Sequence, residues 1–297
     1  MAHGMGAQKD MGLSFYAEAF ASGGLAAFVF DYRSFGGSDG EPRQWVSPSR
    51  HVQDWHAAVQ YVRTQLSGSV DSSRLCLWGT SFAGGHVLAV ARDAPGITAI
   101  VSQVPHLDAR AATLMSIKKR GIPKALLSLA LGAADAIGSR LGLPPLYLPL
   151  VGPERSLAFM QLSEFETKEY FSKHPSVYQG GWQNKARAAL VWELFAHKYS
   201  PIRSVPDLSC PIQFVAATED VLCPVDQVLK AVRLAKHGVL LSRQCTHFEL
   251  YRGKLFEGLV AEQVAFLRQH TGLAKAAAAD MAPEGVSDAA GFQDQDR

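Results

Sequence analysis

The segment Gly79–Gly84 constrains the fold of this chain more than any other feature. It reads Gly-Thr-Ser-Phe-Ala-Gly and stands between the apolar run Leu75–Trp78 and a helical run that extends through Val90. A strand, a Gly-x-Ser-x-small turn and a helix in this order predict a nucleophile elbow, which presents the Ser81 hydroxyl at the end of a sheet. An ordinary strand–helix connection that carries a serine is the alternative, because short motifs have false positives.

Two later segments offer the acid and the base that a serine nucleophile needs. Asp220 follows the strand-like run Ile212–Ala216, and His247 follows a second such run, Val239–Ser242. The chain order serine, acid, histidine is the order that accompanies a nucleophile elbow. The histidine removes the serine proton and the acid orients the histidine. We therefore predict a catalytic triad of Ser81, Asp220 and His247.

Both downstream assignments have alternatives. Asp220 precedes Pro224, so it is also suited to cap a helix or to lie in a surface turn. His247 is also compatible with a plain loop histidine. Glu219 and Asp108 are the rival acids.

The start of the chain offers a second backbone turn for the same site. His3-Gly4-Met5-Gly6 precedes the amphipathic stretch Leu13–Phe20. A turn of this kind lends one backbone N–H to an oxyanion hole, and the residue after the nucleophile lends the other. We expect Met5 and Phe82 to be these donors.

Five segments carry a resemblance to a known family: HGMGAQKDMGLSFYAEAF, FDYRSFGGSDGEPRQ, LWGTSFAGGHVL, ATEDVLCP and THFELY. With them the chain resembles the α/β-hydrolases, and more narrowly the bacterial and fungal hydrolases related to dienelactone hydrolases and to fungal polyketide transferases. The segments span residues 3 to 251. Ala83 departs from the glycine that the elbow usually has, but alanine is small enough to fit.

The resemblance and the alternating pattern imply an α/β fold, a mainly parallel sheet flanked by helices with a helical cap insertion. Further strands are expected at Leu25–Asp31 and Ile97–Ser102, and a helix is expected from the Ser47-Pro48 start through Arg63. The predicted division is 1–107 for the first part of the core, 108–200 for the cap, 201–273 for the second part of the core and 274–297 for a disordered tail.

The sequence gives weaker indications of which residues contact the substrate. His106 ends a predicted strand, and aromatic residues are frequent in the predicted cap. We expect His106, Trp182 and Trp192 to contact substrate, although cap aromatics more often form the cap's own core. The apolar cap favours a small molecule with a largely apolar acyl group.

Composition excludes several other functions. Lys and Arg number 29 against 27 Asp and Glu, without a basic run, so we expect no nucleic-acid partner. The four cysteines lack CxxC spacing, and we expect no metal, no cofactor and no disulfide framework. Residues 1–20 do not read as a signal peptide. Asp135, Arg140 and prolines interrupt the apolar stretch Leu126–Val151, so we expect no membrane span and a cytoplasmic protein.

Three functions follow from these features. The first is a serine hydrolase that cleaves an ester or thioester through an acyl-enzyme. The second is an acyltransferase of the polyketide transferase type, in which an alcohol replaces water and the triad is the same. The third is a non-catalytic protein with the same fold.

The amino terminus conflicts with the expected fold. The oxyanion turn should follow a buried strand that lies between the strand at Leu25–Asp31 and the strand before Ser81, yet it begins at residue 3. A strand takes about 5–6 residues, so Met1-Ala2 cannot form one. We therefore expect the chain to be an amino-terminally shortened version of a longer protein, with Met1 an internal methionine of the missing strand. The alternative is that the neighbouring strands re-pair and move Met5 away from Ser81.

Overall fold

A four-stranded parallel sheet forms the centre of the molecule. The computed structural model describes residues 1–166, 181–196 and 199–273. The strands follow one another in the order β1-β2-β7-β8. Their bounds are Cys76–Thr80 for β1, Ala99–Gln103 for β2, Ile212–Ala217 for β7 and Gly238–Arg243 for β8. Every residue of β2 and β7 is buried, as expected for central strands that are covered on both faces.

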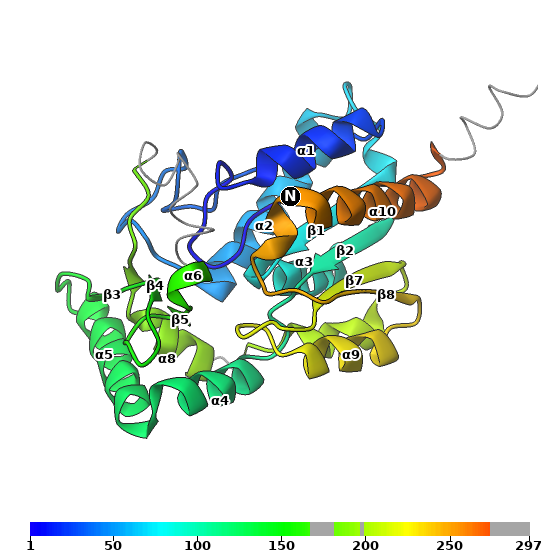
Figure 1. The fold of residues 1–297 in the computed structure, drawn as a ribbon. Coiled ribbons are helices and arrows are strands. Elements are labelled where there is room, and N and C mark those ends of the chain that lie inside the picture. The colour runs from blue at the N-terminus through cyan, green and yellow to red at the C-terminus, as the bar shows by residue number, and fades with distance from the viewer. Residues whose placement is uncertain (167–180, 197–198, 274–297) are drawn as a thin grey trace, which may run out of the picture.

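Helices cover both faces of this sheet (Figure 1). On one face α1 (Leu13–Ser22) packs against α10 (Gly253–Thr271). The other face carries α2 (Pro48–Gln65), α3 (Phe82–Asp93) and α9 (Val225–Leu234). The predicted start of α2 at Ser47-Pro48 is confirmed. These elements, with three short 3-10 helices at Ser72–Arg74, Pro201–Asp207 and Glu249–Tyr251, form the α/β-hydrolase fold that the sequence predicts.

Between β2 and β7 the chain leaves the sheet and forms a separate layer of helices and short strands (Figure 1). Its helices are α4 (Ala109–Arg120), α5 (Ile122–Arg140), α6 (Glu164–Glu166) and α8 (Ala189–Ala196). Strand β3 (Tyr147–Leu148) pairs with β6 (Ala186–Arg187), and β4 (Val151–Gly152) pairs with β5 (Met160–Gln161). We call this layer, residues 109–196 as far as they are described, the cap.

Helix α5 buries its small and polar face. Its buried residues are Ser128, Gly132, Asp135 and Gly138, and Asp135 forms an ion pair with Arg187 of β6 at 2.8 Å. By length and composition α5 is the one helix of the described residues that is long and apolar enough to cross a membrane, which alone is weak evidence for a span. The ion pair ties it to the cap, and the absence of a membrane span stays a prediction.

The strand predicted at Leu25–Asp31 does not form, so this prediction is wrong. Met1 and Ala2 lie in its partner position, between this segment and β1. Ala2 makes an isolated parallel bridge with Gly79, and the Met1 amino group donates to the Phe28 carbonyl oxygen at 2.7 Å. A strand is defined by a hydrogen-bonded neighbour, and only these two residues reach along the segment. Residues 24–31 therefore run as a loop, with Ala26 and Ala27 exposed.

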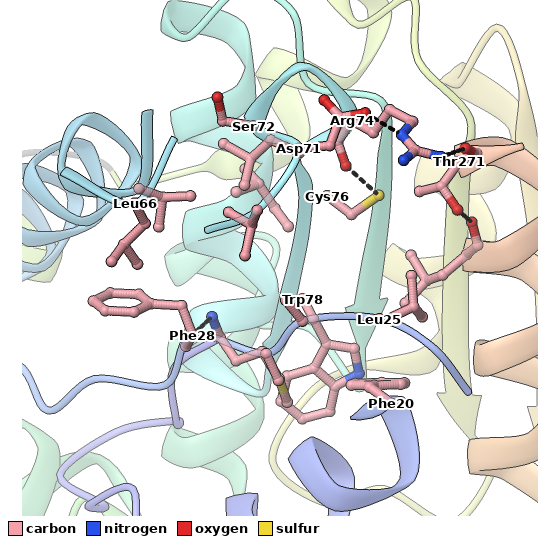
Figure 2. A pocket seen from close by; sticks show the side chains of 18 of the residues that line it. Phe20, Leu25, Phe28, Leu66, Asp71, Ser72, Arg74, Cys76, Trp78 and Thr271 are labelled. Atoms are coloured by element: carbon pink, nitrogen blue, oxygen red, sulfur yellow. Dashed lines mark hydrogen bonds and ion pairs between the residues drawn. The ribbon is translucent and has the colours of Figure 1, made fainter. Parts of the chain in front are cut away.

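A cavity of about 440 Å³ extends from Met1 between the loop and β1 (Figure 2). Leu25, Phe28, Cys76 and Trp78 line it, so its walls are mainly apolar. Burial lowers the pKa of the Met1 amino group to about 5. The loop and β1 do not pair across this cavity.

Candidate active site

Ser81 occupies a strained turn between β1 and α3. Its backbone has φ 58° and ψ −119°, in the left-handed half of conformational space that a residue with a side chain seldom adopts. Gly79 makes the turn possible, because a Cβ there would lie 2.3 Å from the Ala83 carbonyl oxygen. Ala83 itself is fully buried and is accommodated. The strand–turn–helix context expected for the motif is therefore present.

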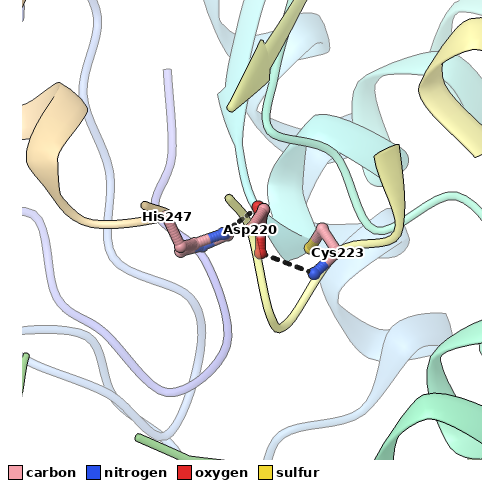
Figure 3. A group of neighbouring side chains, drawn as sticks. All are labelled: Asp220, Cys223 and His247. Atoms are coloured by element: carbon pink, nitrogen blue, oxygen red, sulfur yellow. Dashed lines mark hydrogen bonds and ion pairs between the residues drawn. The ribbon is translucent and has the colours of Figure 1, made fainter. Parts of the chain in front are cut away.

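His247 and Asp220 form a buried hydrogen-bonded pair (Figure 3). The imidazole Nδ1 donates to the Asp220 Oδ2 at 2.6 Å, and each side chain is 1% exposed. The other carboxylate oxygen accepts the backbone N–H groups of Leu222 and Cys223 at 2.7 and 2.8 Å. With Nδ1 as the donor, Nε2 is left as the basic nitrogen of the ring. This is the geometry that an acid needs in order to orient a histidine base.

The two rival acids have other surroundings. Asp108 caps α4 by accepting from the backbone of Arg110 and Ala111, and its second oxygen accepts from the Ser200 hydroxyl at 2.7 Å. Glu219 is exposed. No hydrogen bond joins either of them to His247 in the described part of the chain.

A second cavity, of about 320 Å³, opens at Ser81 and runs under the cap. Met5, Phe82, His106 and Cys223 line it around the serine. The structure thus brings the predicted triad serine, both predicted oxyanion residues and His106 to one pocket. Burial lowers the pKa of His106 to about 4, although the nearby Asp108 carboxylate opposes that shift, so the ring is neutral at pH 7.

The turn predicted to supply an oxyanion donor lies directly against Ser81. A Cβ on Gly4 would lie 2.7 Å from the Ser81 Cβ and 3.0 Å from its Oγ. The His3 ring fixes the turn, since its Nδ1 accepts the Gly4 N–H at 2.8 Å and its Nε2 donates to the Met11 carbonyl oxygen at 2.9 Å. Met5 and Ser81 therefore lie beside each other on the same pocket.

The two predicted tryptophan contacts lie elsewhere. The Trp182 indole N–H donates to the Gly6 carbonyl oxygen at 2.8 Å, so this side chain supports the oxyanion turn. Trp192 is 37% exposed on α8 and packs against Phe195 at 6.1 Å between ring centroids. Neither is among the described residues that line the pocket. An indole needs one hydrogen-bond acceptor, and for Trp182 a backbone carbonyl supplies it.

Sequence reasoning missed Cys223, which lies against the acid–base pair (Figure 3). Its Sγ, a carboxylate oxygen of Asp220 and a ring nitrogen of His247 lie within 4.8 Å of one another, a spacing that also suits a metal ion. A metal would require a thiolate. Burial and the Asp220 carboxylate raise the pKa of the Cys223 thiol well above its usual value, while the Ser81 hydroxyl partly offsets this. The donor set fits an acid–base pair beside a neutral thiol better than a metal site.

A buried network beneath the elbow holds the ends of β1 and β2. The Gln103 side chain accepts from Tyr16 of α1 at 3.1 Å and from Gln263 of α10 at 2.8 Å, and it donates to the Thr80 hydroxyl at 3.2 Å. Thr80 also shares a hydrogen bond with the Tyr251 hydroxyl. Helices α1 and α10 therefore both contact the ends of β1 and β2, next to Ser81.

Relatives of known sequence cover almost the whole chain. The quorum-quenching protein AidA of Acinetobacter baumannii is 34% identical over 269 residues, which are 91% of this chain and 85% of that protein. The thiohydrolase aneE of Aspergillus aculeatus is 25% identical and covers 90% of this chain, with 84% of its own length matched. The polyketide transferase af380 of Aspergillus fumigatus is also 25% identical, over 91% of this chain and 88% of its own length.

Solved structures show the same fold at lower identity. The complex of DcsB with its substrate analogue superposes with a TM-score of 0.75 at 22% identity, over 91% of this chain and 89% of that one. The α/β hydrolase GrgF from Penicillium gives a TM-score of 0.71 at 21% identity, over 92% and 89%. The family model described as serine aminopeptidase, S33, matches residues 1–249. The chain therefore belongs to the serine aminopeptidase S33 family of α/β-hydrolases.

Proposed function

We propose that this protein is a serine hydrolase that cleaves an ester or thioester of a largely apolar acyl group. The observation that carries the proposal is the buried hydrogen bond of 2.6 Å between His247 and Asp220, in a protein whose Ser81 occupies a strained elbow. Strain of this kind persists where it serves a function. Family members named thiohydrolase and acyltransferase support hydrolase or acyltransferase chemistry.

The mechanism follows from the roles of the groups. His247 Nε2 accepts the hydroxyl proton as Ser81 Oγ attacks the carbonyl carbon, and Asp220 stabilises the imidazolium that forms. The backbone N–H groups of Met5 and Phe82 receive the developing oxyanion, and one such donor contributes about 3 kcal/mol. The imidazolium then protonates the leaving alcohol or thiol. Water, activated by the same histidine, releases the acyl group.

The lining of the pocket supports an apolar acyl group. Leu126, Leu129, Phe159 and Leu194 of the cap all line it. Apolar pockets bind by excluding water from apolar surface, with a few polar groups that fix orientation. The name quorum-quenching given to one relative is compatible with a small acyl substrate, but it does not identify one.

A fluorophosphonate probe tests the nucleophile directly. We expect the full chain to be labelled at Ser81 and Ser81→Ala to lose both labelling and esterase activity. Ser67→Ala, at an exposed position after α2, is the matched control and should keep both. Labelling that persists in folded Ser81→Ala would refute the assignment.

Acyl transfer to an alcohol is the second candidate, since several relatives are named polyketide transferase. The same acyl-enzyme serves both reactions, so they differ only in whether water or an alcohol takes the acyl group from it. Product analysis with and without alcohol acceptors measures it. Ester formation at millimolar alcohol would favour transfer, whereas free acid alone would favour hydrolysis.

A further inference from the structure

Helix α5 presents an apolar face to solvent. From position 126 to position 137, every exposed residue of the helix is apolar: Leu126, Leu127, Ala130, Ala134 and Ile137. With about 3.6 residues per turn, these positions fall within one arc of about 100°. A surface helix normally turns its apolar stripe to the core and its charged residues to solvent. Helix α5 has the reverse arrangement, because the residues that it buries are small or polar.

The apolar surface continues beyond the end of α5. The described residues include 16 large apolar side chains that are exposed, and half of these lie between positions 114 and 146. Six of them define what we call the α5 patch: Ile122, Leu126, Leu127, Ile137, Leu141 and Leu143. Figure 1 shows α5 at the outer edge of the cap, away from the central sheet. A cluster of exposed apolar side chains on one helix face marks an interaction surface.

Positive charge flanks the α5 patch. Residues 109–146 hold six Lys and Arg but a single acid, and that acid is Asp135, which is buried in its ion pair. The whole chain has 29 basic and 27 acidic residues, so the remainder has 23 basic and 26 acidic residues. Lys118, Lys124 and Arg140 are exposed near the two ends of α5. The patch is therefore apolar with a cationic rim, in a chain whose other residues carry a slight excess of acid.

The pocket at Ser81 reaches the surface at the same patch. Ile122 and Leu126 line the pocket under the cap, and they are also 66% and 61% exposed. Side chains that are exposed and also line a pocket mark a place where the pocket opens to the outside. Ser81 and Phe82 line the same pocket. An opening of the pocket is therefore bordered by the α5 patch.

We propose that the α5 patch docks on the surface of an anionic lipid bilayer, with α5 lying in the plane of the interface. Apolar side chains of such a helix enter the boundary of the acyl region, and flanking Lys and Arg contact anionic headgroups. The helix does not cross the bilayer, because Asp135 on its other face is held in the cap by Arg187. The pocket opening then faces lipid, so an apolar acyl substrate enters from the membrane. That last step rests on the proposed hydrolase function.

Two other occupants of the patch fit the observations less well. In a two-fold dimer the same surface meets itself, so a second copy would bring two cationic rims together. The cores of protein–protein interfaces are enriched in aromatic residues, and Lys is depleted from such interfaces. The α5 patch consists of Leu and Ile with Lys at its rim. Its composition and charge are complementary to an anionic lipid surface.

Sedimentation with sucrose-loaded vesicles measures docking. The probes are vesicles of phosphatidylcholine alone and vesicles in which about a third of the lipid is phosphatidylglycerol. We expect the full chain to partition about tenfold or more strongly onto the anionic vesicles, and the partition to fall as salt is raised. Ser81→Ala should partition like the unmodified protein, because docking requires no reaction at Ser81.

Leu127→Ser combined with Ile137→Ser tests the apolar part of the patch. Both side chains are exposed on α5, and neither lines the pocket. The pair should lower partition about tenfold or more, because less apolar surface leaves water on docking. Leu229→Ser combined with Leu234→Ser, at exposed positions of α9, is the matched control and should leave partition unchanged. Turnover of p-nitrophenyl acetate in solution should be unchanged in both pairs, which verifies that they fold.

Lys118→Gln combined with Arg140→Gln tests the charge. Neither residue lines the pocket. Each basic residue near an anionic surface contributes to binding, so the pair should lower partition onto the anionic vesicles about tenfold or more and leave the weak partition onto phosphatidylcholine unchanged. Lys230→Gln combined with Arg233→Gln, also a Lys and an Arg exposed on a helix, is the matched control and should have no effect.

Equal partition onto the two kinds of vesicle, or partition that survives the substitutions in α5, would overturn the proposal. A dimer in light scattering that becomes a monomer in Leu127→Ser with Ile137→Ser would also overturn it, because a second copy would then cover the patch. Fluorophosphonate labelling separates these failures from failure of the proposed function. If Ser81 is labelled and no vesicle binds, docking alone is wrong. If vesicles bind and Ser81 is not labelled, docking stands and the hydrolase proposal is wrong.

Discussion

Asp220→Asn separates the role of the acid from its structural contribution. The asparagine oxygen still accepts the backbone N–H groups of Leu222 and Cys223, which the Asp220 Oδ1 accepts now. The other oxygen becomes an NH₂ group that faces His247 Nδ1 at the site of a hydrogen bond of 2.6 Å. Two donors cannot share that bond, so the ring must take the tautomer with its proton on Nε2. That nitrogen then cannot accept the serine proton.

The expected loss is large and confined to the reaction. A wrong tautomer in an intact triad lowers kcat about 10⁴-fold, which corresponds to about 5.4 kcal/mol at 1.36 kcal/mol for each factor of ten. The free energy of unfolding should change little, because both backbone hydrogen bonds remain. Steady-state hydrolysis of a p-nitrophenyl ester gives kcat, and urea titration followed by circular dichroism gives the stability.

Asp108→Asn and Glu219→Gln are the matched controls. The first keeps an N-cap for α4, because asparagine caps helices as well as aspartate does. The second changes an exposed side chain. Both should keep kcat within a few-fold. If either control lost more activity than Asp220→Asn, the acid would have to be reassigned.

Three further predictions concern stability. The following buried histidines have pKa values lowered by burial: His51 to about 3, His106 to about 4, and His86 well below its usual value. Between about pH 4 and pH 6.5 the unfolded chain binds protons at these rings and the folded protein does not. The free energy of unfolding is therefore highest above about pH 6.5, and each ring lowers it by roughly 1.4 kcal/mol per pH unit as the pH drops toward 4. Equal urea midpoints at pH 7.5 and pH 5 would contradict this. Arg187→Met leaves the buried Asp135 carboxylate unpaired and should cost about 3–5 kcal/mol in urea titration, whereas Arg92→Met at an exposed pair should cost under about 1 kcal/mol. Fusing five or six alternating apolar residues to Met1 should raise the melting temperature above that of a Gly-Ser fusion of equal length, and identical melting curves would show that the cavity beside Met1 does not accept a strand.

Local patterns predicted which strand ends carry Ser81, Asp220 and His247. The glycines around Ser81, the acid after one strand and the histidine after the next are each encoded within a few residues. The order of the strands then brings Ser81, Asp220 and His247 to the same edge, because parallel strands all end there. The positions of these three residues were predictable because the strand, turn and helix signals around each of them agree.

The features that prediction missed depend on contacts between distant segments. Leu25–Asp31 has the apolar composition of a strand, but a strand needs a neighbour, and composition does not reveal whether one is present. Trp182 reads as a cap aromatic, and its bond to Gly6 joins residues 176 positions apart. Cys223 lies in the quoted segment ATEDVLCP, but nothing in that segment indicates that its thiol packs against His247, which lies 24 positions later.

The network under the elbow has a consequence for how the protein matures. Gln103 and Thr80 hold the strand ends through Tyr251 and Gln263, which follow Ser81 by about 170 to 180 positions in the chain. During synthesis Ser81 therefore emerges from the ribosome long before His247, its proposed base, and before α10, which braces the strand ends. The elbow conformation is strained, and the strain is supported only when those contacts exist. A nascent chain should thus carry an unreactive serine until α10 docks, so that reactivity depends on a late step of folding.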